Sequence, residues 1–290
     1  MATPVLLKDI LPGTGGSLPS NFTTIGESLF FSAYAPGIGR EIWTSDGTTA
    51  GTRLLADIRP GYEGAYPASL TSVGGFIYFT ANDGEIWVSD GTTAGTHLLA
   101  DIWASDYGEA PLDHAAVDGL IYFSANESST GTELWVSDGT TAGTHLLADI
   151  DPGSYYLYLP NGSFPADFTA VGNLVFFSAN DGTNGREIWV SDGTTAGTHL
   201  LADIAPGFYS SNPTYLTAVG NFVFFSANDG TNGRELWVSD GTTAGTHLLA
   251  DIQPGSYYGN DPKGSFPGDF TAVGNLVFFS ANDGTNGREI

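Results

Sequence analysis

The sequence predicts an all-β protein, a six-bladed β-propeller of four-stranded blades. A segment of the form Leu-Trp-Val-Ser-Asp-Gly-Thr-Thr-Ala-Gly-Thr-His-Leu-Leu-Ala-Asp-Ile, clearest at 134–150, recurs along the 290 residues. The Asp-Ile pair that closes each copy ends at residues 10, 58, 102, 150, 204 and 252, so six copies fill the chain. Spacings of 44 to 54 residues are typical of propeller blades. The 40 glycines and the lack of helical periodicity argue against a helical repeat.

Each copy predicts four short strands, most clearly in the fourth copy. We expect the first strand at 168–171, the second at 174–179, the third at 187–190 and the fourth at 199–204. The segments 172–173, 180–185 and 191–194 supply turns between them, because Gly, Asn and Asp tolerate a positive φ. The second strand is apolar on both of its faces, so neighbouring blades must cover both faces of the sheet.

The two ends of the chain are expected to close the ring. Residues 5–10 match a fourth strand that lacks its first three, whereas the C-terminal copy stops within its third strand, at Glu289 and Ile290. Pairing of residues 5–10 beside Glu289 would complete the last blade and hide two open sheet edges. Residues 1–290 would then form one propeller domain. An open β-solenoid is the alternative, and it would leave those edges bare.

Composition limits the partners. Eight Lys and Arg against 32 Asp and Glu give a net charge of −24, which disfavours nucleic acid and anionic membrane as partners. The absence of cysteine excludes disulfides, thiolate metal sites and a cysteine nucleophile. No apolar run is long enough to span a bilayer, and the first residues do not begin a signal peptide. We expect a secreted or cell-surface protein whose export signal has been removed; the alternative is a chain that stays inside the cell.

A family resemblance rests on the third-strand cores. Segment 41–48 is Glu-Ile-Trp-Thr-Ser-Asp-Gly-Thr, and segments 133–140 and 235–242 are Glu-Leu-Trp-Val-Ser-Asp-Gly-Thr. These cores resemble the bacterial ELWxxDGT repeat, and the resemblance covers nearly the whole chain. It implies a part of a large exported or surface-associated protein and says little about activity. Ile replaces Leu in some copies and the sixth core is missing, so we expect flanking domains of a longer chain.

Residues present in every copy are best explained by packing or turns. The third-strand tryptophans are therefore expected in the core between blades: Trp43, Trp87, Trp135, Trp189 and Trp237. The Glu that begins each third strand is expected to form an ion pair or to cap backbone groups, because six equivalent carboxylate pairs make a poor enzyme. The histidines at the start of the fourth strands are expected at the surface: His97, His145, His199 and His247. His114 is expected in an aromatic core position.

The turn between the second and third strands is a weak calcium candidate. Asp181, Asp229 and Asp283 each begin an Asp-Gly-Thr-Asn-Gly-Arg-Glu segment whose oxygen side chains are spaced as hard-cation ligands sometimes are. The segment lacks the Asp-x-Asp-x-Asp-Gly order and contains an arginine. We therefore expect a tight hairpin without metal and no cofactor.

The connections from a fourth strand to the next first strand differ between copies, and function is expected there. Four run 11 residues and two run 17. In a four-stranded meander they emerge on the same rim as the turns between second and third strands. The candidate ligand-binding residues on this rim are Tyr62, Tyr155, Tyr156, Tyr158, Tyr209, Tyr257, Tyr258, Asn184, Arg186, Asn232 and Arg234.

Flat aromatic rings beside amide and guanidinium groups suit a sugar, whose C–H face stacks while its hydroxyls form hydrogen bonds. An equally weighted interpretation is that these tyrosines pack over the next blade. The sequence thus predicts a non-enzymatic module that binds carbohydrate. A structural or adhesive protein–protein module is the alternative. A hydrolase in the central channel is disfavoured, because no unique carboxylate pair, Ser-His-Asp set or histidine cluster breaks the repeat.

Overall fold

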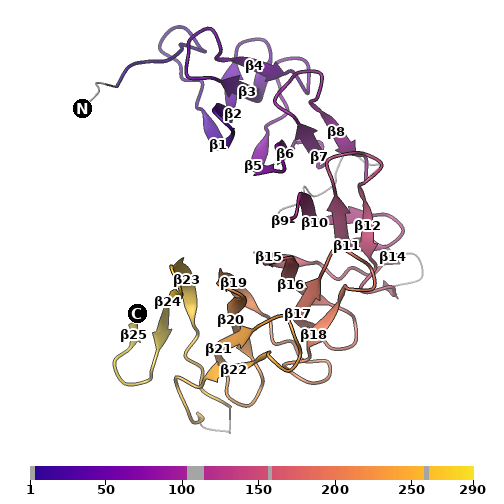
Figure 1. The fold of residues 1–290 in the computed structure, drawn as a ribbon, viewed down its shortest axis with the longest axis vertical. Coiled ribbons are helices and arrows are strands. Elements are labelled where there is room, and N and C mark those ends of the chain that lie inside the picture. Colours follow the sequence, from indigo (N-terminus) through magenta and orange to yellow (C-terminus); the bar gives the residue numbers. More distant parts are fainter. Residues whose placement is uncertain (1–3, 103–113, 156–158, 258–260) are drawn as a thin grey trace. The chain divides into compact units, whose positions relative to one another are not determined.

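The computed structural model describes residues 4–102, 114–155, 159–257 and 261–290, and these residues form an all-β structure (Figure 1). The described ranges contain no helix, so none of them offers a helix that could cross a membrane. The strands form antiparallel sheets that follow one another in chain order, one sheet for each sequence repeat. The prediction of repeated β-sheet blades is therefore confirmed.

Five sheets have four strands paired in chain order. They are β1 (Ser20–Ile25), β2 (Ser28–Ala35), β3 (Gly39–Ser45) and β4 (Arg53–Ala56); β5 (Ala68–Val73), β6 (Phe76–Thr80), β7 (Ile86–Ser89) and β8 (His97–Ala100); β9 (His114–Val117), β10 (Leu120–Glu127), β11 (Gly131–Ser137) and β12 (His145–Ala148); β15 (Ala166–Val171), β16 (Leu174–Asn180), β17 (Arg186–Ser191) and β18 (His199–Ala202); and β19 (Thr214–Val219), β20 (Phe222–Asn228), β21 (Arg234–Ser239) and β22 (His247–Ala250). The last sheet has three strands, β23 (Gly268–Val273), β24 (Leu276–Asn282) and β25 (Arg288–Glu289). A short hairpin pairs β13 (Ser154–Tyr155) with β14 (Leu159–Pro160).

The chain divides into two compact units. Unit 1 comprises Met1–Leu112 and Asp138–Thr144 and contains the sheets β1–β4 and β5–β8. Unit 2 comprises Asp113–Ser137 and His145–Ile290 and contains the other four sheets.

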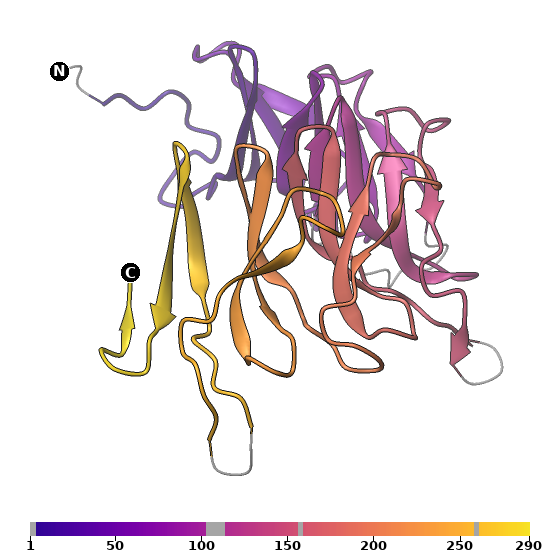
Figure 2. The ribbon, with the colours of Figure 1, turned by 60° about the horizontal axis from the view of Figure 1, so that its bottom comes forward.

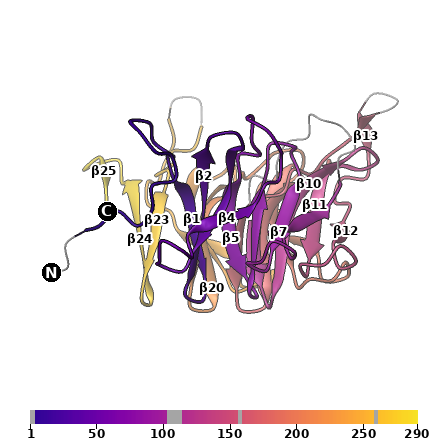
Figure 3. The same ribbon diagram turned by 90° about the horizontal axis from the view of Figure 1, so that it is seen from above.

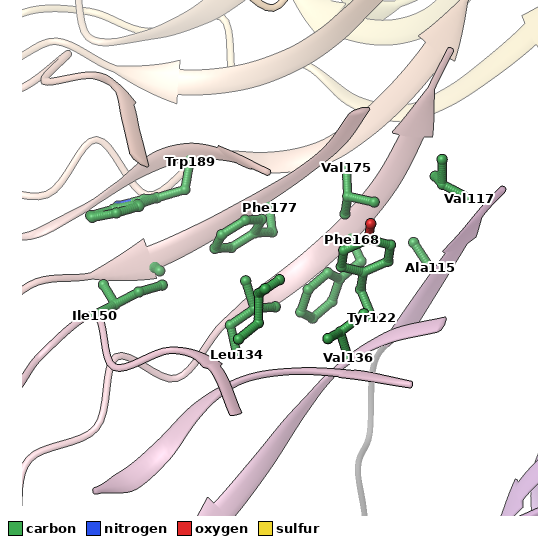
Figure 4. Close-up of a cluster of buried hydrophobic side chains, with 12 residues drawn as sticks. Ala115, Val117, Tyr122, Leu134, Val136, Ile150, Phe168, Val175, Phe177 and Trp189 are labelled. Carbon is green, nitrogen blue, oxygen red and sulfur yellow. The ribbon is translucent and has the colours of Figure 1, made fainter. Parts of the chain in front are cut away.

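The core lies between successive sheets. In unit 2, Phe177 and Trp189 pack with Leu134 and Ile150 of the preceding sheet (Figure 4). In unit 1, Phe30 and Leu55 form an equivalent cluster with Phe79 of the next sheet. Trp43, Trp135 and Trp189 are at most 9% exposed, which confirms their expected place in the core, whereas Trp87 and Trp237 are only partly buried at the border of the clusters. Burying each such ring contributes about 2–3 kcal/mol.

The hairpin between the third and fourth strands explains the most regular part of the repeat. In the first copy, the Asp46 carboxylate accepts hydrogen bonds from the N–H and the hydroxyl of Thr48. Gly47 has a φ of 84°, which a residue with a side chain adopts only under strain. A Cβ on Gly51 would lie 2.0 Å from Asp46, so this position also requires glycine. Ser45 and Thr52 join the two sides of the hairpin through their hydroxyls, 2.7 Å apart.

A second threonine of this hairpin ties neighbouring sheets together. The Thr93 hydroxyl donates to the carbonyl of Leu55 at 2.6 Å, and Thr195 and Thr243 make the same bond to Leu147 and Leu201 of the preceding sheets. The sheets β5–β8, β15–β18 and β19–β22 thus each carry one side-chain hydrogen bond to the fourth strand of the sheet before them. The bond is made by a residue that occurs in every complete copy.

Residues 5–10 occupy the position of such a preceding fourth strand within unit 1. The Thr49 hydroxyl donates to the carbonyl of Leu7 at 2.8 Å, and Ile10 packs against the cluster of Phe31, Ala33 and Trp43. However, these residues form no strand.

The predicted pairing of residues 5–10 with Glu289 and Ile290 is therefore absent, since β25 pairs with β24 alone among the described strands. In a complete copy, Ile188, Trp189 and Val190 pair with the fourth strand. Of these three positions the last copy contains only the equivalent of Ile188, which is Ile290. Of the three pairing residues, the last copy therefore offers only one to residues 5–10.

Candidate functional site

The long connections between sheets lie against the turns between second and third strands. In unit 2, the Arg186 N–H donates to the Ser210 hydroxyl at 2.9 Å, and the Asn212 N–H donates to the Arg186 carbonyl at 3.2 Å. The same connection also binds the next turn, because the Asn228 N–H donates to the Ser211 carbonyl. We call these connections and turns together the loop edge. Figure 2 shows residues 261–267, which lead into β23, and the turn between β24 and β25 at the same end of their sheet.

A buried glutamate fixes the start of each connection. The Glu187 carboxylate accepts hydrogen bonds from the N–H groups of Ile204, Ala205 and Ser211 and from the Ser211 hydroxyl. This confirms the predicted backbone cap, and it explains why β18 ends at Ala202 although the pattern extends the strand to 204. Burial raises the pKa of Glu187 above its ordinary value, and these donors only partly oppose that shift. The same balance raises the pKa of Glu41 and Glu133.

The two candidate arginines bind the protein itself. Arg186 donates to the carbonyl and hydroxyl of Ser178 and to the carbonyls of Ser163 and Phe164. Arg234 repeats this arrangement with Ser226 and Ser211 in the next sheet. Each guanidinium therefore holds a long connection against the sheet that follows it. Sequence reasoning placed both arginines at the correct edge but did not show that their donors are already engaged.

The calcium candidates form tight turns. One oxygen of Asp181 accepts the N–H groups of Thr183 and Asn184, and the other accepts the Asn184 amide at 2.7 Å. These bonds outweigh desolvation and lower the pKa of Asp181. Asp229 with Asn232 and Asp283 with Asn286 make the same bonds. The part of the chain that the structure describes holds no group of three His, Asp or Glu side chains arranged for a metal ion.

The candidate tyrosines differ in how far they are described. Tyr62 is 80% exposed and Tyr209 is 79% exposed. Tyr257 is exposed, and the Lys263 ammonium lies 5.8 Å from the centre of its ring. The backbone of Tyr155 belongs to the hairpin β13–β14, which extends beyond the ends of β10 and β11 (Figure 3). Tyr156, Tyr158 and Tyr258 lie outside the described residues.

One described tyrosine lines a cavity. Tyr209 borders a space of about 380 Å³ together with Ala205, Pro206, Asp229 and Gly230. The cavity joins the connection before β19 to the turn after β20, so the two parts of the loop edge meet at it. At the preceding junction, Asp151 takes the place of Ala205 and Gly182 takes the place of Gly230. The Asp151 carboxylate lies close to this glycine, because a Cβ added to Gly182 would be 2.8 Å from it. The shorter alanine side chain leaves more room at the later junction.

The histidines at the start of the fourth strands are exposed, as predicted. His114 pairs with Phe123 across β9 and β10 and is partly buried.

Sequence reasoning expected an exposed aromatic at Tyr66 but missed that it belongs to a set of four exposed residues with an unusual backbone at the loop edge. Each directly precedes a proline and has a positive φ; they are Leu18, Tyr66, Phe164 and Phe266, with φ values of 47°, 52°, 48° and 49°. Their exposed fractions lie between 56% and 69%. The recurring Phe-Pro, Tyr-Pro and Leu-Pro pairs before the first strands were the available signal, but a large residue before proline predicts an extended backbone.

Known proteins resemble this chain in fold only. No protein-family model matches the chain, and no curated protein matches its sequence. Among solved structures, the computationally designed Ika8 protein is similar with a TM-score of 0.51 and 21% identity, over 95% of this chain and 71% of that one. A structure from a study of two prolyl endopeptidases has a TM-score of 0.50 and 14% identity, over 91% of this chain and 37% of that one.

These likenesses agree with a propeller-like arrangement of antiparallel blades. At such low identity they describe the fold alone. Puromycin hydrolase is also similar, with a TM-score of 0.48 and 12% identity, over 91% of this chain and 42% of that one. The chain spans less than half the length of the endopeptidase and hydrolase chains that it matches.

Proposed function

We propose that the chain is a closed six-bladed β-propeller that binds a neutral glycan at its loop edge and has no enzymatic activity. The observation that carries the proposal is the cavity of about 380 Å³ that is lined by both Tyr209, whose side chain is largely exposed, and Asp229. An aromatic face next to a hydrogen-bond acceptor is the combination that holds a sugar ring. The net charge of −24 favours a neutral ligand over an acidic polysaccharide.

Closure of the ring is supported by the bond from Thr49 to Leu7. This bond repeats the ones that join complete sheets, which supports residues 5–10 as the segment that would supply the closing strand. We further propose kinship with the ELWxxDGT repeat family and a secreted or cell-surface location. A central-channel hydrolase stays disfavoured, because the buried glutamates hold backbone N–H groups in several equivalent copies.

A structural or adhesive protein–protein module is the second candidate, and one observation favours it. The last sheet exposes large apolar side chains, with Leu276 at 62% and Phe278 at 44%. An exposed patch of this kind is typical of an interface between proteins. The closed ring would cover this face with its own first sheet, whereas an adhesive module would present it to a partner.

Electrophoresis in native gels that contain hydroxyethylcellulose, xyloglucan or galactomannan tests the glycan proposal. We expect retardation of the wild-type chain by at least one of these neutral polysaccharides. Tyr209→Ala should weaken the binding about five- to tenfold, because an aromatic contact contributes about 1 kcal/mol, and Tyr209→Phe should retain it. His199→Ala, an exposed change on a fourth strand, is the matched control. A wild-type chain retarded by none of the three would overturn the proposal.

A further inference from the structure

Four residues with large side chains at the loop edge adopt a backbone conformation that is unfavourable for two reasons. A positive φ is strained for any residue with a bulky side chain, and a following proline adds a preference for extended backbone. Phe164, before Pro165, and Phe266, before Pro267, have both features in unit 2, and Tyr66 and Leu18 repeat them in unit 1. Exposing these side chains to water adds a further cost.

The fold explains the backbone at this position. The Phe164 N–H donates to the Thr132 carbonyl at 3.1 Å, and its carbonyl accepts the Arg186 guanidinium at 2.7 Å. The neighbours Ser163 and Pro165 are buried on either side. These contacts hold the residue in the left-handed region and direct its side chain outward, as strain persists only where the surroundings impose it.

The fold does not explain the side chain. Asn212 occupies the same place before β19, with a φ of 46° and an N–H that donates to the Arg186 carbonyl. Asparagine tolerates the left-handed region and is soluble, so it meets every requirement of the backbone. An exposed phenylalanine at the equivalent positions carries a backbone strain that asparagine avoids, and more than half of its side chain faces water. Side chains that oppose stability at a loop surface are best explained by binding.

We propose that Phe164 and Phe266 form the stacking platform for the glycan, an inference that rests on the proposed function. They lie two residues before β15 and β23, whose sheets stand on either side of the sheet β19–β22 (Figure 1), so a glycan that contacts both rings would span the intervening sheet. Asp269 lies three residues after Phe266 and has a side chain that is 78% exposed, so this part of the loop edge also carries an exposed hydrogen-bond acceptor. A neutral polysaccharide with flat C–H faces fits this combination.

The test replaces each phenylalanine by asparagine, the residue that the chain itself has at the equivalent position 212 before β19. Phe164→Asn and Phe266→Asn should leave the melting temperature unchanged or raise it, because asparagine relieves the strain. The double variant should bind at least about tenfold more weakly in the polysaccharide gels, on the scale of two lost aromatic contacts. Asn212→Phe is the converse variant: it should lower the melting temperature and strengthen binding.

Each result decides between the proposals. If the asparagine variants melt at lower temperature, the rings are packing elements and the platform is overturned. If wild type and double variant are retarded equally, the stacking role falls while glycan binding stands. If the wild-type chain is retarded by none of the polysaccharides, glycan binding and the platform fall together.

Discussion

Segments 167–188 and 269–290 have the same sequence but different surroundings. In the first, Phe176 and Ile188 are 0% exposed, because β19 and β20 cover that face of the sheet. In the second, the equivalent Phe278 is 44% exposed and Ile290 is 95% exposed. Both copies nevertheless make the same turn, with the Asp carboxylate bonded to the Asn three residues later. Turn geometry therefore depends on the copy itself, whereas burial depends on its neighbour.

The largest expected effect is on stability, and it distinguishes the buried ring of Phe176 from the exposed ring of its copy Phe278. Phe176→Ala should lower the free energy of unfolding by about 3–5 kcal/mol, because it leaves a cavity between two sheets. With the exposure that the structure gives it, Phe278→Ala should cost only about 1–2 kcal/mol, whereas in the closed ring that we propose it should cost about as much as Phe176→Ala. Urea denaturation of the two variants measures both values. Equal costs would contradict the exposure of Phe278 and show that the last face is covered in solution, as a closed ring requires.

A smaller effect is expected on the pH dependence of the melting temperature, which should distinguish Glu187 from its copy Glu289. Burial raises the pKa of Glu187 above 4.5, so its contribution to stability is fully present below pH 4.5 and is lost as the pH rises through the raised pKa. Melting temperatures between pH 4.5 and 7 should therefore depend less on pH in Glu187→Gln than in wild type. Glu289→Gln removes the same charge from an exposed position and is the matched control. The same slope in both variants would show that Glu187 does not titrate differently on folding.

The smallest expected effect concerns calcium, for which the two copies should behave alike. The oxygens of Asp181 and Asp283 already accept hydrogen bonds within their turns, so a cation would have to displace them. Millimolar calcium should then leave the melting temperature unchanged, because only preferential binding to the folded state would raise it. Scanning calorimetry with calcium and with EDTA makes the measurement. A rise of several degrees that EDTA reverses would establish a cation site.

Features that depend on one repeat could be predicted from the sequence. The strands of the fourth copy, the Gly- and Asp-rich turns, the core position of Trp189 and the cap made by Glu187 all follow from periodicity and turn chemistry. Features that depend on contacts between copies could not. The engaged donors of Arg186 and the missing ladder beside Ile290 follow from which groups meet across a junction. The left-handed Phe164 escaped prediction because hydrogen bonds from two other segments impose a backbone that its own sequence disfavours.

The hydroxyl bond from each hairpin to the preceding fourth strand has a consequence for how such a chain changes in evolution. The donor, Thr93, Thr195 or Thr243, and the apolar faces beside it are supplied by the copy itself, and the acceptor is a backbone carbonyl that any copy offers. A gene duplication that inserts one more copy would therefore create a working junction on both sides without a compensating mutation. Stability in such repeats is close to a sum over neighbours, so an inserted copy would add its own junction to that sum.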